Sequence, residues 1–403
     1  MEKCRSCGAE NLVLVLDLGK QPWGNHFVPI EEFTGHPTYP LEAYFCEACT
    51  MVQIGYTVPK ELMFTSHNYV SGTTRSLKIH FEKIGEDILK RAAFGPTDYI
   101  LDIGGNDGTF LEYFHRLGKR VLNVDSGVKQ AKLSNDKGIE CRNQFFNLES
   151  AQAILAERGQ ALVIHGSGVF FHLEELHSVF EGIKVLLAPK GMVVAEFIYL
   201  PEMVHNNAFD QIYHEHLLYY SLKSFGYLLA QHGLEIYDAQ LMPIHGGSCI
   251  AYIGHQGGHA KTEALAAMIQ AEQAGKFDQV ETYLEFAKRV ATLKNQMTEM
   301  IEGLKAEGKS IQALGAPVKG STIINYCGLD ESVIDCAVEI NPMKCGTYVP
   351  GTRIPVYHQD QTPAPDVYLM LSWNFKTEIL EKLKDFRANG GQVLMPIPHP
   401  ELI

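Results

Sequence analysis

The sequence has no apolar run that approaches the roughly 20 residues needed to span a membrane as a helix. Positive charge is also in short supply: 34 Lys and Arg stand against 47 Asp and Glu, for a formal net charge of −13. Binding to nucleic acid or to anionic lipid needs a basic face, so this balance disfavours both. The start, Met1-Glu2-Lys3-Cys4, lacks the composition of a signal peptide. We therefore expect a cytoplasmic protein that binds neither nucleic acid nor membrane.

Signs of disorder, internal repeats and low-complexity tracts are absent as well. Apolar residues make up 46% of the chain and charged residues 20%, which is typical of a globular protein. At about 150 residues per domain, a chain of 403 residues predicts two to three domains. The sequence does not predict an oligomeric state.

The nine cysteines are an odd number in a large chain without an export signal, which disfavours structural disulfides. Four of them form two Cys-x-x-Cys pairs, Cys4 with Cys7 and Cys46 with Cys49, and 38 residues separate the pairs. Two such turns can complete a tetrahedral zinc site, and four sulfur ligands leave no position open for water. We expect a structural Zn²⁺; two unrelated thiol pairs are the alternative. The other cysteines, Cys141, Cys249, Cys327, Cys336 and Cys345, are expected to be reduced residues of the core.

Apolar strands alternate with helical stretches in two parts of the chain, which predicts parallel sheets covered on both faces. A long amphipathic helical stretch at 260–307 separates these parts. The fold class is therefore α/β, with a zinc module at 1–75, a first α/β domain at 76–257, and a helical linker with a second α/β domain at 258–403. The expected strands are 99–103, 120–124, 161–164 and 192–197 in the first domain, and 311–314, 333–338, 367–371 and 392–395 in the second.

A glycine-rich turn, Gly104-Gly105-Asn106-Asp107-Gly108, follows the first of these strands and precedes a helix expected at 109–116. It fails the Gly-x-Gly-x-x-Gly pattern of dinucleotide binding, because Asn106 stands at the third position. Asp102 and Asp107 would repel a pyrophosphate but suit a cationic ligand. S-adenosylmethionine carries a sulfonium and an ammonium group and no phosphate, so it fits. An ordinary strand-to-helix turn is the alternative.

The run Tyr213-His214-Glu215-His216 places four chemically capable side chains in four consecutive positions. It precedes Ser221, an expected N-cap of a helix at 222–229, so the cluster is predicted to lie in a loop. Two imidazoles beside a carboxylate and a phenol favour acid–base catalysis. The spacing is not His-Glu-x-x-His, and a second metal site is the alternative.

The glycine loop resembles the first motif of class I S-adenosylmethionine-dependent methyltransferases. In this likeness Asp102, Gly104 and Gly108 match, Asn106 replaces a glycine, and Asp125 corresponds to the acid that accepts both ribose hydroxyls. Taken in order, several motifs together resemble the zinc-containing sugar C-methyltransferases, which act on nucleotide-linked 4-keto-deoxyhexoses. The motifs are the two Cys-x-x-Cys pairs and the segments 102–109, 213–217, 245–248, 315–320, 339–344 and 348–351.

The resemblance implies a role for each part of the chain. S-adenosylmethionine would bind in a class I methyltransferase domain, at Asp102, Gly104, Asn106, Asp107, Gly108 and Asp125. A nucleotide-diphosphate keto-sugar would bind in a Rossmann-like C-terminal domain. His216 resembles the general base, and its companions in the site would be Tyr213, Glu215, His172 and Tyr69, the last reaching in from the N-terminal module.

Lys319 and Gly320 stand in a glycine-bounded turn before a helix expected to begin near Ser321. Backbone N–H groups at a helix N-terminus, together with a lysine, suit a diphosphate. Asn325 and Tyr326 on the same helix are further candidates for substrate contact, and a solvated turn lysine is the alternative for Lys319.

A ketone acidifies the neighbouring carbon, so the predicted reaction is proton removal by His216, formation of an enolate, and methylation of the carbon, at C3 of the 4-keto sugar. Two other functions stay open. One is methylation of oxygen or nitrogen on a small metabolite. The other is a non-catalytic protein that binds S-adenosylmethionine and zinc.

Overall fold

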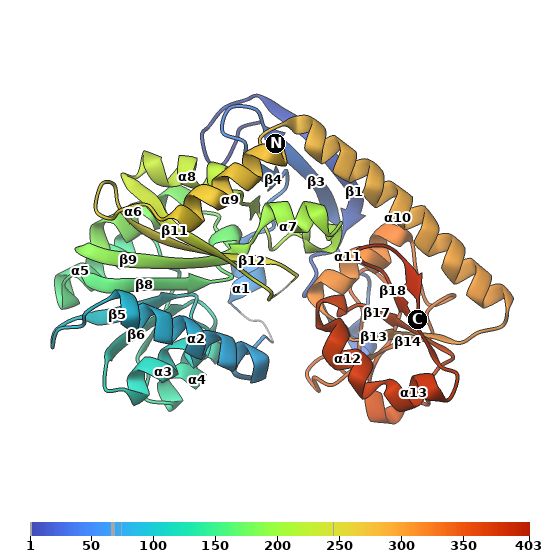
Figure 1. Cartoon of the computed structure of the whole chain (residues 1–403). Coiled ribbons are helices and arrows are strands. Elements are labelled where there is room, and N and C mark those ends of the chain that lie inside the picture. The colour runs from blue at the N-terminus through green and yellow to red at the C-terminus, as the bar shows by residue number, and fades with distance from the viewer. Residues whose placement is uncertain (1, 66–68, 74, 245) are drawn as a thin grey trace.

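The computed structural model describes residues 2–65, 69–73, 75–244 and 246–403. The chain is built from an N-terminal module, which we define as the described residues before α2 (Arg75–Arg91), and two α/β lobes that stand side by side below it (Figure 1). The expected fold class is confirmed, whereas the exact domain boundaries stay a prediction. Asn68 and His245, which belong to two of the motifs above, lie outside the described residues.

The N-terminal module contributes β1 (Leu12–Gln21), β3 (Tyr39–Cys46) and β4 (Val52–Ile54) to a four-stranded antiparallel sheet, whose fourth strand is β10 (Leu218–Tyr219). Because Leu12 pairs with Cys46, the β1–β3 hairpin brings the two Cys-x-x-Cys turns together. The Sγ atoms of Cys4 and Cys49 are 3.6 Å apart, those of Cys7 and Cys46 are 3.5 Å apart, and all four lie within 4.8 Å of one another. Zn–S bonds of about 2.3 Å in a tetrahedron place sulfurs about 3.8 Å apart, so the four cysteines fit zinc.

The first lobe holds a seven-stranded sheet in the order β11-β12-β9-β8-β5-β6-β7. Its parallel part comprises β5 (Tyr99–Ile103), β6 (Arg120–Asp125), β7 (Cys141–Asn143), β8 (Ala161–Ser167) and β9 (Leu187–Ile198). The hairpin β11 (Leu234–Met242) and β12 (Ser248–His255) continues it antiparallel. β9 begins at Leu187, five residues before the expected start, because the backbone of Leu187 already pairs with Ala161 of β8.

Helices cover both faces of this sheet, as expected from strands that are apolar throughout. On one face α2 and α3 (Thr109–Arg116) pack against Ile100 and Val163. On the other face α5 (Leu148–Arg158), α6 (Leu176–Leu186) and α8 (Leu222–Gln231) pack against Leu101 and Ile164 (Figure 1). Successive residues of a strand point to opposite faces, so Ile100 and Leu101 belong to two separate cores. Ser221 caps α8 as predicted, by accepting a hydrogen bond from the backbone of Ser224.

The expected long helical stretch is two helices, α9 (Glu263–Ala274) and α10 (Val280–Ala306), with a break after Gly275. At 1.5 Å per residue, the 27 residues of α10 extend about 40 Å. The helix runs from the N-terminal module to the second lobe (Figure 1). Its Tyr283 packs on Phe45 of β3, with ring centroids 5.2 Å apart, so α10 ties the module to the lobe.

The second lobe holds a six-stranded sheet in the order β16-β14-β13-β17-β18-β19. β13 (Ile311–Leu314), β14 (Cys336–Glu339), β16 (Val356–His358), β17 (Val367–Met370) and β18 (Gln392–Met395) are parallel, and β19 (Glu401–Leu402) is antiparallel. A two-stranded sheet of β2 (Val28–Pro29) and β15 (Thr347–Tyr348) joins this lobe to the N-terminal module.

The helix expected to begin near Ser321 is α11 (Val318–Cys327), which begins three residues earlier. Pro317 precedes its first residue and favours that start, since proline needs no backbone donor at the first turn. Lys319 and Gly320 therefore lie within the first turn of the helix and not in a turn before it. Glycine is favoured at position 320, because the Cβ atom of any other residue would come within 2.9 Å of Leu371.

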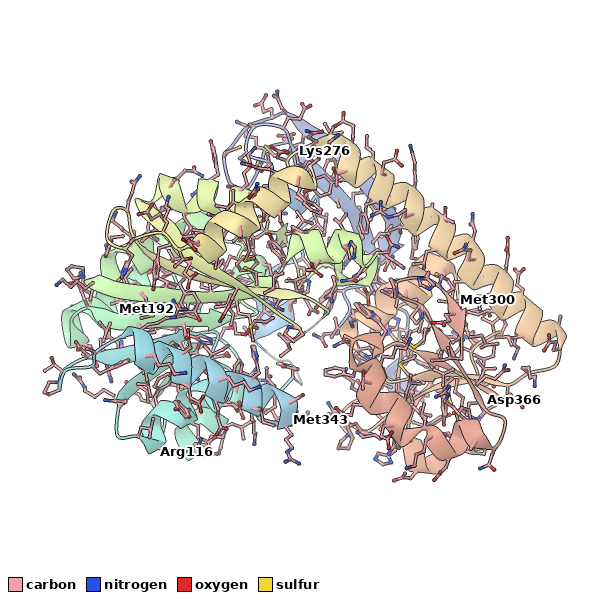
Figure 2. All side chains as sticks on the ribbon, in the orientation of Figure 1. Arg116, Met192, Lys276, Met300, Met343 and Asp366 are labelled. Atoms are coloured by element: carbon pink, nitrogen blue, oxygen red, sulfur yellow. The ribbon has the colours of Figure 1, made fainter. Side chains whose placement is uncertain are left out.

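Side chains fill the layers of both lobes, and Met343 marks where the second lobe approaches the first (Figure 2). The Nζ of Lys129, on α4 (Val128–Asp136) of the first lobe, lies 2.8 Å from the Met343 sulfur. None of the helices in the described part of the chain has the length and apolar composition to cross a membrane.

We predict that Cys46→Ser abolishes stoichiometric zinc binding and lowers the thermal midpoint by several degrees, because metal binding contributes directly to the folding of such modules. Zinc content by elemental analysis and thermal unfolding check this. Cys141→Ser, outside the four-cysteine cluster, is the control and should retain the metal. Full zinc content in Cys46→Ser would contradict the assignment.

Candidate active site

A cavity of about 580 Å³ lies where the two lobes and the N-terminal module meet. The strand order reverses at β5, which has β6 and β8 as neighbours, and again at β13, which lies between β14 and β17. Open α/β sheets bind ligands beyond the carboxyl ends of their strands at such points. Both switch points open onto this one cavity, which Gly104 and Asp125 line from the first lobe and Pro317 and Glu339 from the second.

The glycine loop after β5 forms one wall of the cavity. Gly104 has φ +65°, and a Cβ atom there would lie 2.9 Å from Val169. Asn106 also has a positive φ of +52°, which asparagine tolerates better than most residues. The backbone N–H of Asn106 donates to Asp125 Oδ2 at 2.8 Å, which fixes the carboxylate at the end of β6. Burial raises the pKa of Asp125 to about 6. Gly104, Asn106 and Asp125 thus line the cavity together.

The other three residues predicted at the cofactor, Asp102, Asp107 and Gly108, are not among those that line the cavity. Asp102 lies beneath the loop with Oδ1 2.7 Å from Nδ1 of His165, and burial raises its pKa. Asp107 accepts hydrogen bonds from Thr109 and Lys137. Gly108 is the residue before α3, with φ +75°. Their contacts within the protein shape the loop, and their part in cofactor binding stays a prediction.

The Tyr-His-Glu-His cluster lies between η4 (Phe209–Gln211) and β10 (Leu218–Tyr219), in a segment that crosses the cavity wall. Nδ1 of His216 is 2.8 Å from the carbonyl oxygen of Gln211, and Nδ1 of His172 contacts that of Glu215. A carbonyl only accepts, so Nδ1 carries the hydrogen in both rings and the neutral form has its lone pair on Nε2. The two ring centroids are 5.1 Å apart. The structure therefore brings together two imidazoles with the same tautomer.

Aromatic rings enclose the His216 imidazole. The ring centroid of Tyr213 is 3.8 Å away, and Phe171, in η3 (Phe170–His172), makes an edge contact at 4.4 Å. Burial, and next the charge of Glu215, raise the pKa of Tyr213 well above its ordinary value. Its hydroxyl therefore stays protonated and can donate a hydrogen bond.

Glu215 points a buried carboxyl group at the cavity. Asn25 of the N-terminal module donates to it twice, from its backbone N to Oε1 at 3.3 Å and from Nδ2 to Oε2 at 3.0 Å. Burial raises the pKa of Glu215 to about 7, although the bonds from Asn25 and the charge of Lys344 oppose the shift. This carboxyl group can change its protonation state near neutral pH.

Tyr69 lies at the edge of the cavity, with 51% of its surface exposed. Its backbone oxygen accepts hydrogen bonds from Asn106 Nδ2 at 3.3 Å and from Gln130 Nε2 at 2.8 Å. The structure thus attaches Tyr69 to the glycine loop and to α4 at the edge of the cavity.

Among the residues predicted to contact the substrate, Lys319 lines the cavity. Its buried Nζ is 3.7 Å from Asp210 Oδ2 and 4.1 Å above the ring of Trp373, whose indole N–H donates to the same oxygen at 2.6 Å. Burial lowers the pKa of Lys319 and raises that of Asp210. In the described part of the chain, neither Lys319 Nζ nor Asp210 Oδ1 has a hydrogen-bond partner. Lys319 therefore has donors available for a ligand.

Gly320, Asn325 and Tyr326 do not line the cavity. The side chain of Asn325 donates to the backbone oxygens of Ser321 and Pro350, and the ring of Tyr326 packs against Phe209 at 5.3 Å. These contacts hold α11 in place within the protein.

Sequence reasoning missed several cavity residues, notably Asn25, Glu196 and Lys344. Glu196 is buried at the end of β9, with Oε1 2.7 Å from Nε2 of His80 and Oε2 accepting from Ser167. Lys344 donates to the backbone of Ala316 at 2.7 Å, and burial lowers its pKa. Lys344 belongs to a motif quoted above, so a signal existed. No motif in the sequence analysis pointed to Asn25 or Glu196 as residues of the site.

We predict that Glu215→Gln changes how stability depends on pH. The pKa of Glu215 in the folded state is about 7, above its ordinary 4.5, so between these values the folded protein binds more protons than the unfolded chain. The contribution of the protonated Glu215 to the free energy of unfolding is fully present below pH 4.5 and is lost as the pH rises through about 7. Glutamine carries no charge, so the variant does not lose this contribution. At roughly 1.4 kcal/mol per pKa unit, the free energy of unfolding of Glu215→Gln should rise by about 3 kcal/mol relative to that of the natural protein when the pH is raised from 4.5 to 8. Denaturant unfolding at both pH values checks this.

The matched control is Glu299→Gln on the exposed side of α10, which should leave the difference between the two pH values unchanged. A Glu215→Gln profile parallel to that of the natural protein would contradict the predicted shift.

Three sequence families match consecutive parts of the chain. Residues 4–64 match the family described as "Putative zinc binding domain", residues 77–239 a "Methyltransferase domain", and residues 243–398 a "C-methyltransferase C-terminal domain". A curated relative, the C-methyltransferase NovU of Streptomyces niveus, is 33% identical over 407 aligned residues, which cover all of this chain and 97% of the relative.

Two solved structures each resemble part of the chain. An S-adenosylmethionine-dependent methyltransferase from Anabaena variabilis is 16% identical with a TM-score of 0.37, and it covers 44% of this chain and 86% of its own. Geranyl diphosphate C-methyltransferase from Streptomyces coelicolor is 13% identical with a TM-score of 0.34, and it covers 45% of this chain and 80% of its own. The full-length match to NovU and the three families in succession show that the chain belongs to the S-adenosylmethionine-dependent C-methyltransferases with an N-terminal zinc-binding domain.

Proposed function

We propose that this C-methyltransferase methylates a nucleotide-linked 4-keto-deoxyhexose at C3, through proton removal by His216. The observation that carries the proposal is the shared cavity: it joins the glycine loop, two imidazoles of defined tautomer and the carboxyl edge of a second α/β sheet. A methyl acceptor that carries a nucleotide needs a binding region of its own beside the one for S-adenosylmethionine, with the reaction centre between the two regions.

The first lobe would hold the cofactor. S-adenosylmethionine, when bound, supplies an electrophilic methyl group on a sulfonium. Gly104 and Asn106 offer backbone at close approach, and the Asp125 carboxylate, fixed by two backbone N–H groups, suits the ribose hydroxyls. Asp102, Asp107 and Gly108, which do not line the cavity, would maintain the conformation of the glycine loop.

The second lobe would hold the nucleotide sugar. Lys319 lies in the first turn of α11, and the N-terminus of a helix favours an anion; its ammonium has no hydrogen-bond partner among the described residues. We assign the diphosphate to this end of α11. Gly320, Asn325 and Tyr326 would act by keeping the helix in place.

The cluster would carry out the proton transfer. A ketone spreads the charge left by a departing C3 proton onto oxygen, so a base near neutral pH suffices. His216 would accept that proton at Nε2. The hydroxyl of Tyr213, which stays protonated, would donate to the developing oxyanion. Glu215 as a carboxylate would stabilise the imidazolium, and His172 would complete the polar wall. The zinc ion has a structural part in this scheme.

We predict that His216→Asn reduces methyl transfer by at least about 10²-fold, the usual contribution of a general base, while the dissociation constant for S-adenosylmethionine changes less than about twofold. The same variant should lose exchange of the C3 proton with deuterated solvent in the absence of S-adenosylmethionine. Mass spectrometry of a panel of nucleotide-linked 4-keto sugars with labelled cofactor, and proton NMR for the exchange, measure both.

The control is His115→Asn, an exposed histidine on α3, which should behave like the natural protein. A near-normal rate in His216→Asn would show that another group is the base. Turnover without exchange at carbon, with the new methyl group on oxygen or nitrogen, would replace this proposal with an O- or N-methyltransferase.

A further inference from the structure

The N-terminal module reaches the cavity through the loop between β1 and β2. Asn25 in this loop and Glu215 in the cluster are 190 positions apart in the sequence. Each oxygen of the Glu215 carboxyl group receives its own donor, one from the backbone and one from the side chain of Asn25. Such a two-point contact fixes both the position and the plane of the carboxylate.

The second lobe holds this loop in place from the other side. A Cβ atom on Gly24 would lie 2.5 Å from Val318 Cγ1, so the backbone before Asn25 packs directly on the start of α11. After it, the ring of Phe27 lies 4.7 Å from Lys344 Nζ, and Val28 of β2 pairs with Tyr348 of β15. Asn25 is therefore held on both flanks, and its approach to Glu215 is set by the packing of the module on the lobe.

Two N–H donors favour the charged form of a carboxyl group, whereas burial favours the neutral form. Glu215 is buried, and within the described ranges of the chain its carboxyl oxygens accept their two hydrogen bonds from Asn25. Removing the Nδ2 donor leaves a buried oxygen with weaker stabilisation of its charge. The balance between an oriented carboxylate and a neutral acid at this position thus depends on the N-terminal module.

We propose that Asn25 is a positioning residue that keeps Glu215 an oriented carboxylate in the active site, so that the zinc-binding module forms part of the catalytic centre as well as of the fold. The catalytic part of this inference rests on the proposed function, whereas the Asn25–Glu215 coupling does not.

A double-mutant cycle tests the coupling without any substrate. Asn25→Ala, Glu215→Gln and the double variant are unfolded in denaturant at pH 8 and at pH 5. At pH 8, where Glu215 is charged, we expect a coupling of about tenfold in the unfolding equilibrium, or about 1.4 kcal/mol. At pH 5, where Glu215 is protonated, the coupling should fall to about twofold or less. Additive effects at pH 8 would overturn the proposal, whatever reaction the enzyme catalyses.

The pH profile of methyl transfer tests the consequence for catalysis. In Asn25→Ala the acidic limb of kcat should move up by about one pH unit, while the dissociation constant for S-adenosylmethionine stays unchanged. Asn25→Asp, nearly the same shape, should move the limb further, because it places a second carboxylate against the first. Asn11→Ala, an exposed asparagine of the same module, is the control. A limb that stays in place in both Asn25 variants, with the exchange at carbon intact, would overturn the catalytic role alone.

Discussion

The structure depends on one short segment, residues 209–219, which all three parts of the chain hold from different sides. The second lobe binds its start, where Asp210 meets Lys319 and Trp373 and the hydroxyl of Thr322 donates to the backbone of Ile212. The N-terminal module binds its middle, through Asn25 on Glu215 and the carbonyl of Pro40 on His214.

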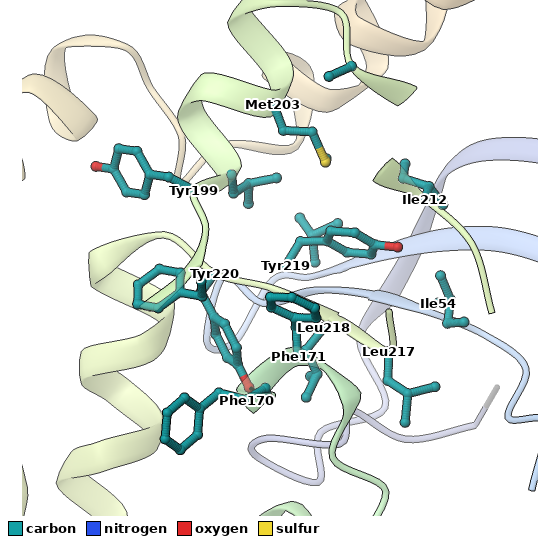
Figure 3. Packing of buried hydrophobic residues seen from close by; sticks show 14 of the residues in the cluster. Ile54, Phe170, Phe171, Tyr199, Met203, Ile212, Leu217, Leu218, Tyr219 and Tyr220 are labelled. Carbon is teal, nitrogen blue, oxygen red and sulfur yellow. Dashed lines mark hydrogen bonds between the residues drawn. The ribbon is translucent and has the colours of Figure 1, made fainter. Parts of the chain in front are cut away.

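The end of the segment becomes a strand of the module's own sheet. In β10, Leu218 pairs with Gln53 and Tyr219 with Val52 of β4, and the backbone N–H of Ile54 donates to Leu217. Figure 3 shows the apolar side of this junction, where Leu217, Leu218 and Tyr219 pack with Ile54 of the module and Phe170 and Phe171 of the first lobe. The hydroxyl of Tyr219 donates to the carbonyl of His216 at 3.0 Å. The positions of the two imidazoles therefore require all three parts to be assembled.

Several ionisable groups stay buried around the cavity, at a cost that packing alone does not justify. Glu215, Asp210 and Lys319 each have a pKa displaced by burial. If substrate binding displaces water from the cavity, the low local dielectric would strengthen the interaction of these groups with a developing charge. The N-terminal module contributes directly to this environment, because Asn25 supplies two donors to Glu215 and also lines the cavity.

Local patterns predicted most of the fold. The apolar run 99–103, the glycine loop and the capped helix after Ser221 each follow from neighbours in sequence, and so does the pairing of the four cysteines. The predicted start of α11 was wrong by three residues: Pro317 favours a helix that begins at Val318, and the packing of Gly320 on Leu371 is a tertiary contact that the local sequence does not reveal.

The candidate site was predictable only in part. The cluster at 213–216 was recognisable because its side chains are adjacent in sequence. Asn25 was not, because its partner is 190 residues away and an asparagine before a strand has many structural uses. Asn325 and Tyr326 share a helix with Lys319, yet they face its packed side, and a sequence does not reveal which side of a helix a cavity will occupy.

In the proposed reaction, one cavity holds S-adenosylmethionine and the nucleotide sugar with His216 between them. A crystal structure with S-adenosylhomocysteine and an unreactive nucleotide-linked hexose tests it most directly. We expect the thioether beside Gly104 and Asn106, the diphosphate at Lys319, and Nε2 of His216 within about 3.5 Å of the hexose carbon that faces the sulfur. A nucleotide bound outside this cavity, or a hexose remote from His216, would contradict it.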